Sequence, residues 1–442
     1  MRDHSKHIQL TREDAVEAML AHSEFDPATE TISITQAYGR VLAHDIVSEV
    51  EFPAVPHAAM DSIAVHWSDF KDLADGELPD TSTWVRGTDW QFANTGVAMP
   101  EGFDTCIVIE HVSVSPDEQH VTIDAAPSKQ CAGTRPVASE LAKGDLLGAA
   151  YSVLGPDLLA RIARGNISQV DVLAKPKVAF IPTGNELVPA GTQPLPRGKN
   201  IETNSILIEG KILAWGGEPV MYDIVPDKPE LIESTILDAC DKADIVVLNA
   251  GSSKGSDDWS CEKLEDMGEV FCHQTNHGPG HHSSYALVNG TPIVGISGPP
   301  MGASFTTDFY LKPVMMKYLK QPTGIKRVKV RLESEFPVSK HGPAALKPGD
   351  KVAGEMRPPE GFDGGARNAS DAAAAKPAAL PMYGIKFVKV AQDNDGTLVA
   401  TPVSAKPGTV AVNPSNAIYM MPNGPDAVPP SAGDIIEVEM TD

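Results

Sequence analysis

The chain has 442 residues, more than one hydrophobic core usually supports, and this length predicts three or four domains. Its 59 acidic residues outnumber its 36 basic ones and give a formal net charge of −23. Such a surface repels phosphate backbones and anionic lipids, and no long run of Lys and Arg occurs. Composition and charge therefore argue against nucleic acid and membranes as partners.

The cysteine pattern and the apolar stretches predict a cytoplasmic protein. Five cysteines form no CxxC pair, which is typical of a reducing compartment rather than of a disulfide framework. The first 20 residues lack the apolar core of a signal peptide. No apolar stretch approaches the roughly 20 residues that a membrane-spanning helix needs.

The N-terminal part alternates helix and short β segments. An amphipathic helix is predicted from about Thr11 to His22, with Thr11 as its N-cap. From Thr31 to about Asp124, short β runs broken by Pro, Gly and Asp are typical of a small β domain. A short helix is expected between Gly155 and Gly165, where the second glycine is its C-cap.

The character changes between Lys177 and Leu319. Continuous apolar runs such as PKVAFIPTG, DIVVLNAG and PIVGISG alternate with helical segments. Strands that lack polar alternation and are separated by helices predict a parallel sheet covered on both faces, a doubly wound α/β domain.

After Thr323 the β pattern returns and predicts a C-terminal β domain. An Ala-, Gly- and Pro-rich insertion at about 340–380 interrupts it, and we expect this insertion to be flexible because it cannot bury enough apolar surface. The predicted domains are 1–46 with 148–176 (N-terminal and linker), 47–147 (β), 177–324 (α/β) and 325–442 (C-terminal β).

Three predicted strands of the α/β domain end in loops of small residues. Ligands bind beyond the carboxyl ends of the strands in this kind of sheet, where small side chains let a phosphate approach backbone N–H groups. The loops are Pro182-Thr183-Gly184-Asn185-Glu186, Ala250-Gly251-Ser252-Ser253-Lys254-Gly255 and Ser297-Gly298-Pro299-Pro300.

Carboxylates gather at the same predicted edge. They are Glu186, Glu202, Asp227, Asp257 and Asp258. Carboxylate oxygens together with substrate phosphates are the ligands that Mg²⁺ prefers, so the set favours a nucleotide-like substrate with Mg²⁺. Each carboxylate taken singly is explained equally well as a cap of a helix.

Six segments resemble, in order and spacing, the motifs of the MoeA and gephyrin E-domain family of molybdopterin molybdotransferases. VPHAAMDSIAV, for example, is similar to the family's FDNSAMDGYAV loop. The other segments are ANTGVAMPEGFDTCIVIEHV, IPTGNELV, ETNS, NAGSSKGSDDW and GISGPPMGA.

The resemblance implies a homodimer of elongated four-domain chains with a Mog-like α/β domain. It implies that adenylylated molybdopterin is bound, that molybdenum or tungsten from molybdate or tungstate is inserted, and that AMP leaves in a step assisted by Mg²⁺. It implies catalytic roles for Asp61, Glu186, Asp227 and Asp258, with the last three as metal ligands. It implies substrate-binding roles for Thr95, Thr183, Gly184, Gly251, Ser252, Ser253, Gly255, Gly280, His281, His282, Ser297, Gly298 and Pro300.

Two loops depart from the family pattern. GPGHH (residues 278–282) replaces KPGKP, so both lysines are absent, and Ser297 and Pro299 replace the first Pro and the Asn of LPGNP. Glu140 stands where an Asp is usual. Histidines in place of lysines predict that anion binding strengthens as the pH falls.

Two further interpretations stay open. A cluster of Cys272, His273, His277, His281 and His282, with Cys261 upstream, contains residue types that bind transition metals but matches no standard zinc spacing. The missing lysines also leave an alternative function, a non-catalytic paralogue that binds molybdopterin or a nucleotide as carrier or scaffold. A pterin adenylyltransferase or a molybdoenzyme is a candidate protein partner for either function.

Overall fold

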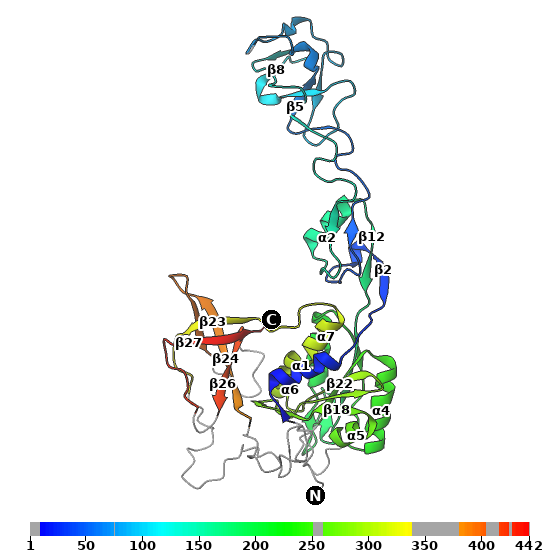
Figure 1. Cartoon of the computed structure of the whole chain (residues 1–442), viewed down its shortest axis with the longest axis vertical. Helices are drawn as coiled ribbons and strands as arrows, with labels where there is room; N and C mark the ends of the chain where they lie inside the picture. Colours follow the sequence, from blue (N-terminus) through cyan, green and yellow to red (C-terminus); the bar gives the residue numbers. More distant parts are fainter. Residues whose placement is uncertain are drawn as a thin grey trace, which may run out of the picture. The chain divides into compact units, whose positions relative to one another are not determined.

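The computed structural model describes residues 9–74, 76–250, 260–337, 380–403, 415–423 and 427–441. The chain divides into two compact units (Figure 1). The smaller unit is residues 28–174, and the larger unit is residues 1–27 together with 175–442. The division into the four predicted domains is finer than this and stays a prediction.

One half of the smaller unit is a small β domain. Its antiparallel sheet has the order β6-β5-β7. Apolar side chains from all three strands, among them Ile63, Trp90 and Ile107, form a common core. The strands of this half are β4 (His57–Ala58), β5 (Ser62–Val65), β6 (Trp90–Ala93), β7 (Thr105–Val108), β8 (Val112–Val114), β9 (Val121–Ile123) and β10 (Thr134–Arg135), with 3₁₀ turns at Trp67–Asp69, Thr81–Thr83 and Ile109–His111.

The other half of the smaller unit packs one helix on short strand pairs. The predicted helix is confirmed as α2 (Pro156–Arg164), which starts with a proline after Gly155 and ends at Gly165. It buries Leu159 and Ile162 in a hydrophobic core that is separate from the core of the small β domain. The paired strands are β2 (Thr29–Ser33) with β12 (Gln169–Leu173) and β3 (Ile46–Val47) with β11 (Leu146–Gly148), and a 3₁₀ turn covers Ile34–Gln36.

The larger unit begins with the predicted N-terminal helix, which is confirmed as α1 (Arg12–His22), but its apolar and polar side chains are not separated on two faces, so the prediction that it is amphipathic was wrong. The hydroxyl of Thr11 accepts a hydrogen bond of 3.0 Å from the backbone N–H of Asp14 and so caps the helix. The residues that α1 buries are Arg12, Ala15 and Met19, so an arginine lies on its inner face.

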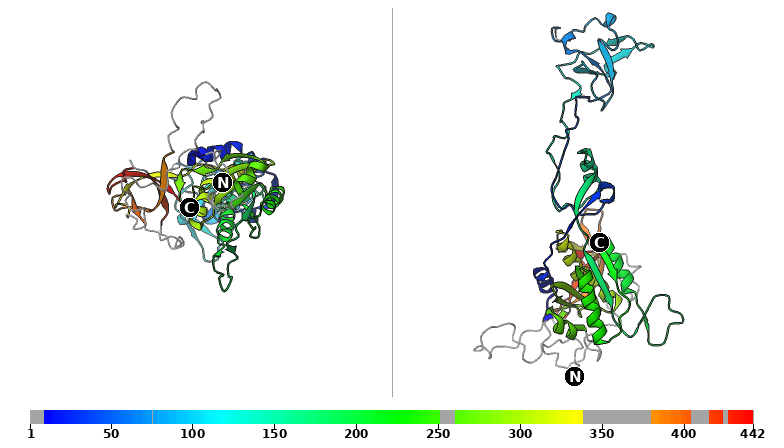
Figure 2. Two further views of the ribbon diagram at one scale, coloured as in Figure 1. Left: turned by 90° about the horizontal axis from the view of Figure 1, so that it is seen from below. Right: turned by 90° about the vertical axis from the view of Figure 1, so that its right-hand side faces the viewer.

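A six-stranded sheet with the order β16-β13-β17-β22-β21-β18 forms the centre of the larger unit (Figures 1 and 2). Its first four strands are parallel, whereas β21 pairs antiparallel with both β22 and β18 and so runs opposite to the other five. The predicted doubly wound α/β domain is therefore confirmed, and the sheet is mixed rather than parallel at the edge formed by β21. The strands are β13 (Lys177–Pro182), β16 (Glu218–Met221), β17 (Ile245–Ala250), β18 (Glu269–Cys272), β21 (Ser284–Val288) and β22 (Thr291–Ser297).

Helices cover both faces of this sheet, as predicted. Along β13, Val178 and Phe180 belong to one core and Ala179 and Ile181 to another, because successive side chains point to opposite faces. The first core includes side chains of α1, α3 (Asn204–Ala214), α6 (Pro300–Thr306) and α7 (Lys312–Tyr318), with a π-helical turn at Thr307–Leu311 between the last two. The second core includes side chains of α4 (Pro229–Lys242) and α5 (Ser260–Met267).

The C-terminal strands of the larger unit close into a small barrel, since β26 pairs with both β27 and β24. The short strand β20, which precedes β21 in the sequence, extends this sheet by pairing with β24. The predicted insertion at about 340–380 falls almost wholly outside the described residues. The strands of this sheet are β20 (His277–Gly278), β23 (Arg327–Leu332), β24 (Met382–Gln392), β25 (Leu398–Pro402), β26 (Ala417–Asn423) and β27 (Ile435–Met440).

Two separate strand pairs complete the larger unit. They are β1 (Gln9–Leu10) with β19 (Gln274–Thr275) and β14 (Leu187–Val188) with β15 (Asn200–Ile201).

Candidate functional site

Three neighbouring parallel strands, β13, β17 and β22, end at one edge of the central sheet. Their register places Pro182 beside Asn249 and Ala250 beside Ser297. The loops that begin at Thr183 and Gly298 therefore flank the end of β17. This edge brings together two of the three loops that the sequence singled out, as the topology of the sheet requires.

Two asparagines that the sequence interpretation did not select tie these loops together. The side-chain N–H groups of Asn204, at the start of α3, donate to Oδ1 of Asn249 (2.7 Å) and to the carbonyl oxygen of Gly298 (2.8 Å). Asn249 donates in turn to the carbonyl oxygen of Ser297 (3.1 Å). A carbonyl oxygen can only accept, so these contacts determine how both amides are oriented. In the sequence, Asn249 is the polar residue that ends the apolar run IVVLN, and this position was the signal that could have identified it.

This orientation leaves Oδ1 of Asn204 without a hydrogen-bond partner among the described residues. The side chain is only 5% exposed. A buried acceptor without a partner is unusual in native proteins and often marks a place where a bound group supplies the donor.

The first loop is shaped by a buried hydroxyl and a glycine. Thr183 donates from its hydroxyl to the backbone oxygen of Asn249 (2.9 Å), so this hydroxyl holds the loop to β17. Gly184 has φ +147°, and a Cβ atom there would lie 2.7 Å from a carboxylate oxygen of Glu186. Only glycine suits this position, and its presence lets the Glu186 carboxylate fold back over the loop.

A cavity of about 610 Å³ lies at this edge of the sheet. Its polar lining includes the carboxylates of Glu186 and Glu202, and Leu187 and Ile201 contribute apolar walls. The described lining contains no lysine or arginine, so it presents acceptors rather than positive charge. Of the predicted binding residues, Thr183, Gly298 and Pro300 line the cavity.

Asp227 is coupled to the first loop through Asn185. The backbone N–H of Asn185 donates to Oδ2 of Asp227 (2.8 Å), and the backbone N–H of Asp227 donates to Oδ1 of Asn185 (3.2 Å). Lys199 donates from its ammonium group to the backbone oxygen of Asn185. Asp227 is therefore held next to the residue that precedes Glu186, and a cation lies close by.

The GPGHH loop packs behind Ser297. A Cβ atom at Gly280 would lie 2.7 Å from Cγ2 of Thr306, and one at Gly302 would lie 2.5 Å from Oγ of Ser297. The rings of His281 and His282 lie 3.8 Å apart, centroid to centroid. Neither histidine is part of the described lining of the cavity. The predicted pH dependence of anion binding stays a prediction.

Several predicted site residues cannot be placed. Asp258 of the catalytic and metal set lies outside the described residues, as does the loop after β17. The binding residues affected are Gly251, Ser252, Ser253 and Gly255.

In the smaller unit, the predicted pair Asp61 and Thr95 is in direct contact. Oδ1 of Asp61 accepts hydrogen bonds from the backbone N–H and from the hydroxyl of Thr95, both 2.9 Å long. These bonds from Thr95 lower the pKa of Asp61, because they stabilise the charged carboxylate. The pair presents an ionised carboxylate at an exposed loop.

The described side chains of the Cys- and His-rich stretch do not converge on a metal site. No group of three or more His, Cys, Asp or Glu side chains that could hold a metal ion is found within the described ranges. Nε2 of His273 lies 3.0 Å from a carboxylate oxygen of Glu265, whereas Nε2 of His277 contacts the hydroxyl of Tyr310 at 2.7 Å. The side chain of Cys261 is outside those ranges.

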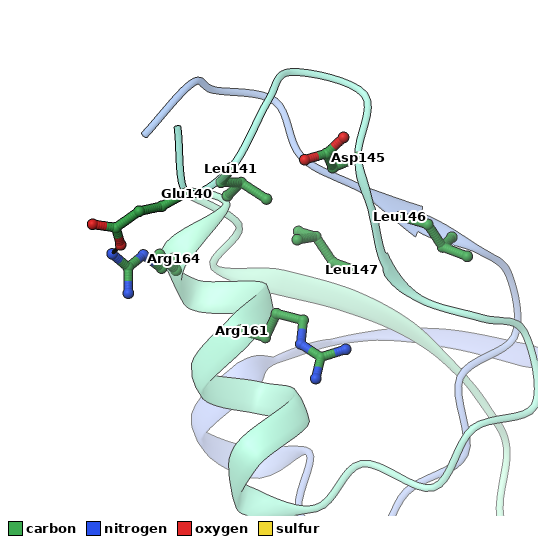
Figure 3. A pocket seen from close by; sticks show the side chains of 7 residues that line it. All are labelled: Glu140, Leu141, Asp145, Leu146, Leu147, Arg161 and Arg164. Carbon is green, nitrogen blue, oxygen red and sulfur yellow. Dashed lines mark hydrogen bonds and ion pairs between the residues drawn. The ribbon is translucent and has the colours of Figure 1, made fainter. Parts of the chain in front are cut away.

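A second region of the smaller unit forms a cavity of about 470 Å³ beside α2 (Figure 3). Glu140 lies at its rim and forms ion pairs with Arg135 (2.5 Å) and Arg164. The guanidinium group of Arg164 also lies 4.2 Å above the ring of Phe52. Glu140 thus holds two arginines together, whereas the Arg161 side chain points away from Glu140 and Arg164 (Figure 3).

The described helices include none that is long and apolar enough to cross a membrane.

Comparisons with known proteins agree with this architecture. Residues 10–164 match the family model "MoeA N-terminal region (domain I and II)", and residues 179–317 match "Probable molybdopterin binding domain". A protein of Haemophilus influenzae named molybdopterin molybdenumtransferase is 27% identical over 316 residues, which are 70% of this chain and 77% of that protein. A protein of the same name from Nostoc is 28% identical over 69% of this chain and 73% of its own length.

The fold is also shared with solved structures. A crystal structure of the molybdopterin biosynthesis MoeA protein of Pyrococcus horikoshii superposes with a TM-score of 0.71 at 21% identity and covers 98% of this chain and 99% of its own. A second structure from that organism has a TM-score of 0.67 at 20% identity. Both parts of the family's sequence pattern and its complete fold occur in one polypeptide, and the chain therefore belongs to the MoeA family.

Proposed function

We propose that this protein is a molybdopterin molybdotransferase that inserts molybdenum or tungsten into adenylylated molybdopterin and releases AMP. The relatives named for this activity cover more than two thirds of the chain's length. The observation that carries the proposal is the cavity at the ends of β13, β17 and β22, inside the part that matches the molybdopterin-binding model.

The carboxylates at this cavity fit Mg²⁺ in their chemistry. Glu186 is exposed at the lining, and Asp227 is held near it through Asn185. Oxygen ligands of this kind suit Mg²⁺, which would supply positive charge against the substrate's phosphates. Without a cation, Glu186 and Glu202 would repel those phosphates. Glu186 and Asp227 are therefore our candidate ligands, together with Asp258.

Replacing Glu186 with glutamine should reduce AMP release about a hundredfold while leaving the fold intact, because the amide keeps the shape but removes the charge that holds a cation. The measurement is Mg²⁺- and molybdate-dependent AMP release from adenylylated molybdopterin. The matched control is Glu209→Gln, an exposed carboxylate on α3 that lies outside the cavity. Equal rates for both variants would remove Glu186 from the site.

The same assay separates the transferase from the carrier alternative suggested by the absent lysines. A carrier binds adenylylated molybdopterin but releases no AMP, whatever the molybdate concentration. A transferase releases AMP in proportion to the pterin that receives metal.

We also propose a homodimer, as the family resemblance implies. Sedimentation equilibrium at micromolar concentration should give twice the mass of one chain. The apparent mass should not fall toward that of the monomer when the protein concentration is raised above this range. A single species with the mass of one chain would contradict the proposal.

A further inference from the structure

The cavity at the ends of the parallel strands and an adjoining cavity of about 600 Å³ both lack positive charge. The described lining of the first contains Glu186 and Glu202, and that of the second contains Glu202 and Asp223, whereas neither includes a lysine or an arginine. The GPGHH loop has no lysine, and its histidines are outside the described lining of both cavities. An anionic substrate held here therefore needs a cation from another segment of the chain.

Lys199 is a lysine that contacts the first loop of the site. Its ammonium group donates to the backbone oxygen of Asn185, the residue that precedes Glu186. An ammonium group has three N–H donors, and this is its one hydrogen bond among the described residues. The side chain is half-buried, so its positive charge is held beside the loop while N–H groups remain for another acceptor.

The backbone also fixes Lys199 at this position. The N–H of the next residue, Asn200, donates to the backbone oxygen of Glu186 (2.8 Å), and the parallel pair of β14 and β15 begins directly after these contacts. The N–H of Lys199 donates to the backbone oxygen of Pro196 (3.1 Å) and closes a turn in which Gly198 has φ +82°. The lysine is therefore built into a turn beside Glu186 and is not placed on a free surface.

An opposite charge is held by the same residue of the first loop. The backbone N–H of Asn185 donates to Oδ2 of Asp227 (2.8 Å), and the backbone oxygen of Asn185 accepts from Lys199. The carboxylate and the ammonium group are thus bound to the two polar groups of one residue. At such short range the ammonium group offsets part of the negative charge of Asp227 and of the neighbouring Glu186.

We propose that Lys199 supplies, from outside the GPGHH loop, the positive charge that the site needs in order to hold the substrate's phosphates. This inference rests on the proposed function. Lys199 is a positioning residue, because it holds Asn185 and reduces the negative potential around Glu186 and Asp227. Its charge attracts phosphate but repels Mg²⁺, so its removal should change the two affinities in opposite directions.

The first test measures AMP without Mg²⁺, and Mg²⁺ alone, by calorimetric titration. Lys199→Met keeps most of the length of the side chain but removes its charge, so it should weaken AMP binding about tenfold. Mg²⁺ binding should tighten or stay within about twofold. Lys199→Arg keeps the charge and the donor and should remain within about threefold of the parent for AMP. The matched control is Arg197→Met, an exposed cation of the same loop, which should change neither affinity by more than about twofold.

The second test restores the absent lysines. Gly278→Lys/His281→Lys recreates the KPGKP spacing, and a Cβ atom at Gly278 would meet no atom within 4 Å. Combined with Lys199→Met, this pair should return the AMP affinity to within about threefold of the parent's, because the charge then comes from the other loop. A lysine that only held the backbone of Asn185 could not be replaced in this way.

The possible failures are distinguishable. An AMP affinity of Lys199→Met within twofold of the parent's, or an equal loss in Arg197→Met, overturns the inference. A parallel loss of AMP and Mg²⁺ affinity, or no recovery with the restored lysines, shows that Lys199 only holds the loop and overturns its role as a charge. A parent that does not bind AMP also overturns the inference, whereas the proposed function is rejected separately, by the absence of molybdate-dependent AMP release.

Discussion

Replacing Glu439 with alanine is expected to lower the free energy of unfolding by about 3–5 kcal/mol, because the buried guanidinium group of Arg12 then loses its buried partner and keeps its ion pair with the exposed Glu13. Arg12 on α1 is 3% exposed and Glu439 on β27 is 5% exposed. They form a two-pronged ion pair with distances of 2.7 and 2.5 Å. Burial by itself lowers the pKa of Arg12, but the hydrogen bonds and the charge of Glu439 raise it overall, so the arginine stays ionised.

The matched control for this prediction is Glu437→Ala. Glu437 is on the same strand but exposed, and its loss should change the unfolding free energy by less than about 1 kcal/mol. Urea denaturation of both variants at pH 7 provides the comparison. The double variant Arg12→Met/Glu439→Leu should recover most of the stability, since no charge then remains buried. Equal losses for Glu437→Ala and Glu439→Ala would show that the ion pair does not join α1 to the barrel.

Acidification should destabilise the larger unit through His277. Burial lowers the pKa of His277 to about 4, and the charge of Arg12 nearby acts in the same direction. The backbone oxygen of Pro279 lies 3.1 Å from Nδ1, so Nδ1 carries the proton and Nε2 accepts from the hydroxyl of Tyr310. The native state therefore holds a neutral imidazole.

The sign of the effect follows from proton binding. As the pH falls below about 6.5, the histidine of the unfolded chain takes up a proton before the native one does. The free energy of unfolding should therefore decrease between pH 6.5 and pH 4, by about 3 kcal/mol in all. Urea denaturation at pH 7, 5.5 and 4.5 measures this slope. His277→Gln should flatten it, whereas His22→Gln, an exposed histidine of the same unit, should leave it in place; a parent without the slope would reject the role of His277.

The sequence predicted which loops form the site, but it did not predict the hydrogen bonds that join these loops. Continuous apolar runs placed the strands that end at Pro182, Ala250 and Ser297, and parallel topology requires their ends to be neighbours. The bonds among Asn204, Asn249 and the Gly298 carbonyl could not be predicted, because each depends on side-chain orientation across 45 to 94 residues of chain. The antiparallel edge strands were missed for a similar reason: short strands such as Glu269–Cys272 carry little periodic signal.

The amino-acid sequence by itself determined the N-terminal helix, the buried parallel strands that end at the site, and the family. These follow from local signals: Thr11 as a helix cap, apolar runs as buried strands, and six motifs in a fixed order. Tertiary structure alone decided which polar groups became buried. Arg12, in the first turn of an N-terminal helix, looks like a solvated residue until the barrel brings Glu439 to it. The reason is physical: burial and ion pairing depend on residues hundreds of positions away, and only packing brings them within a few ångströms.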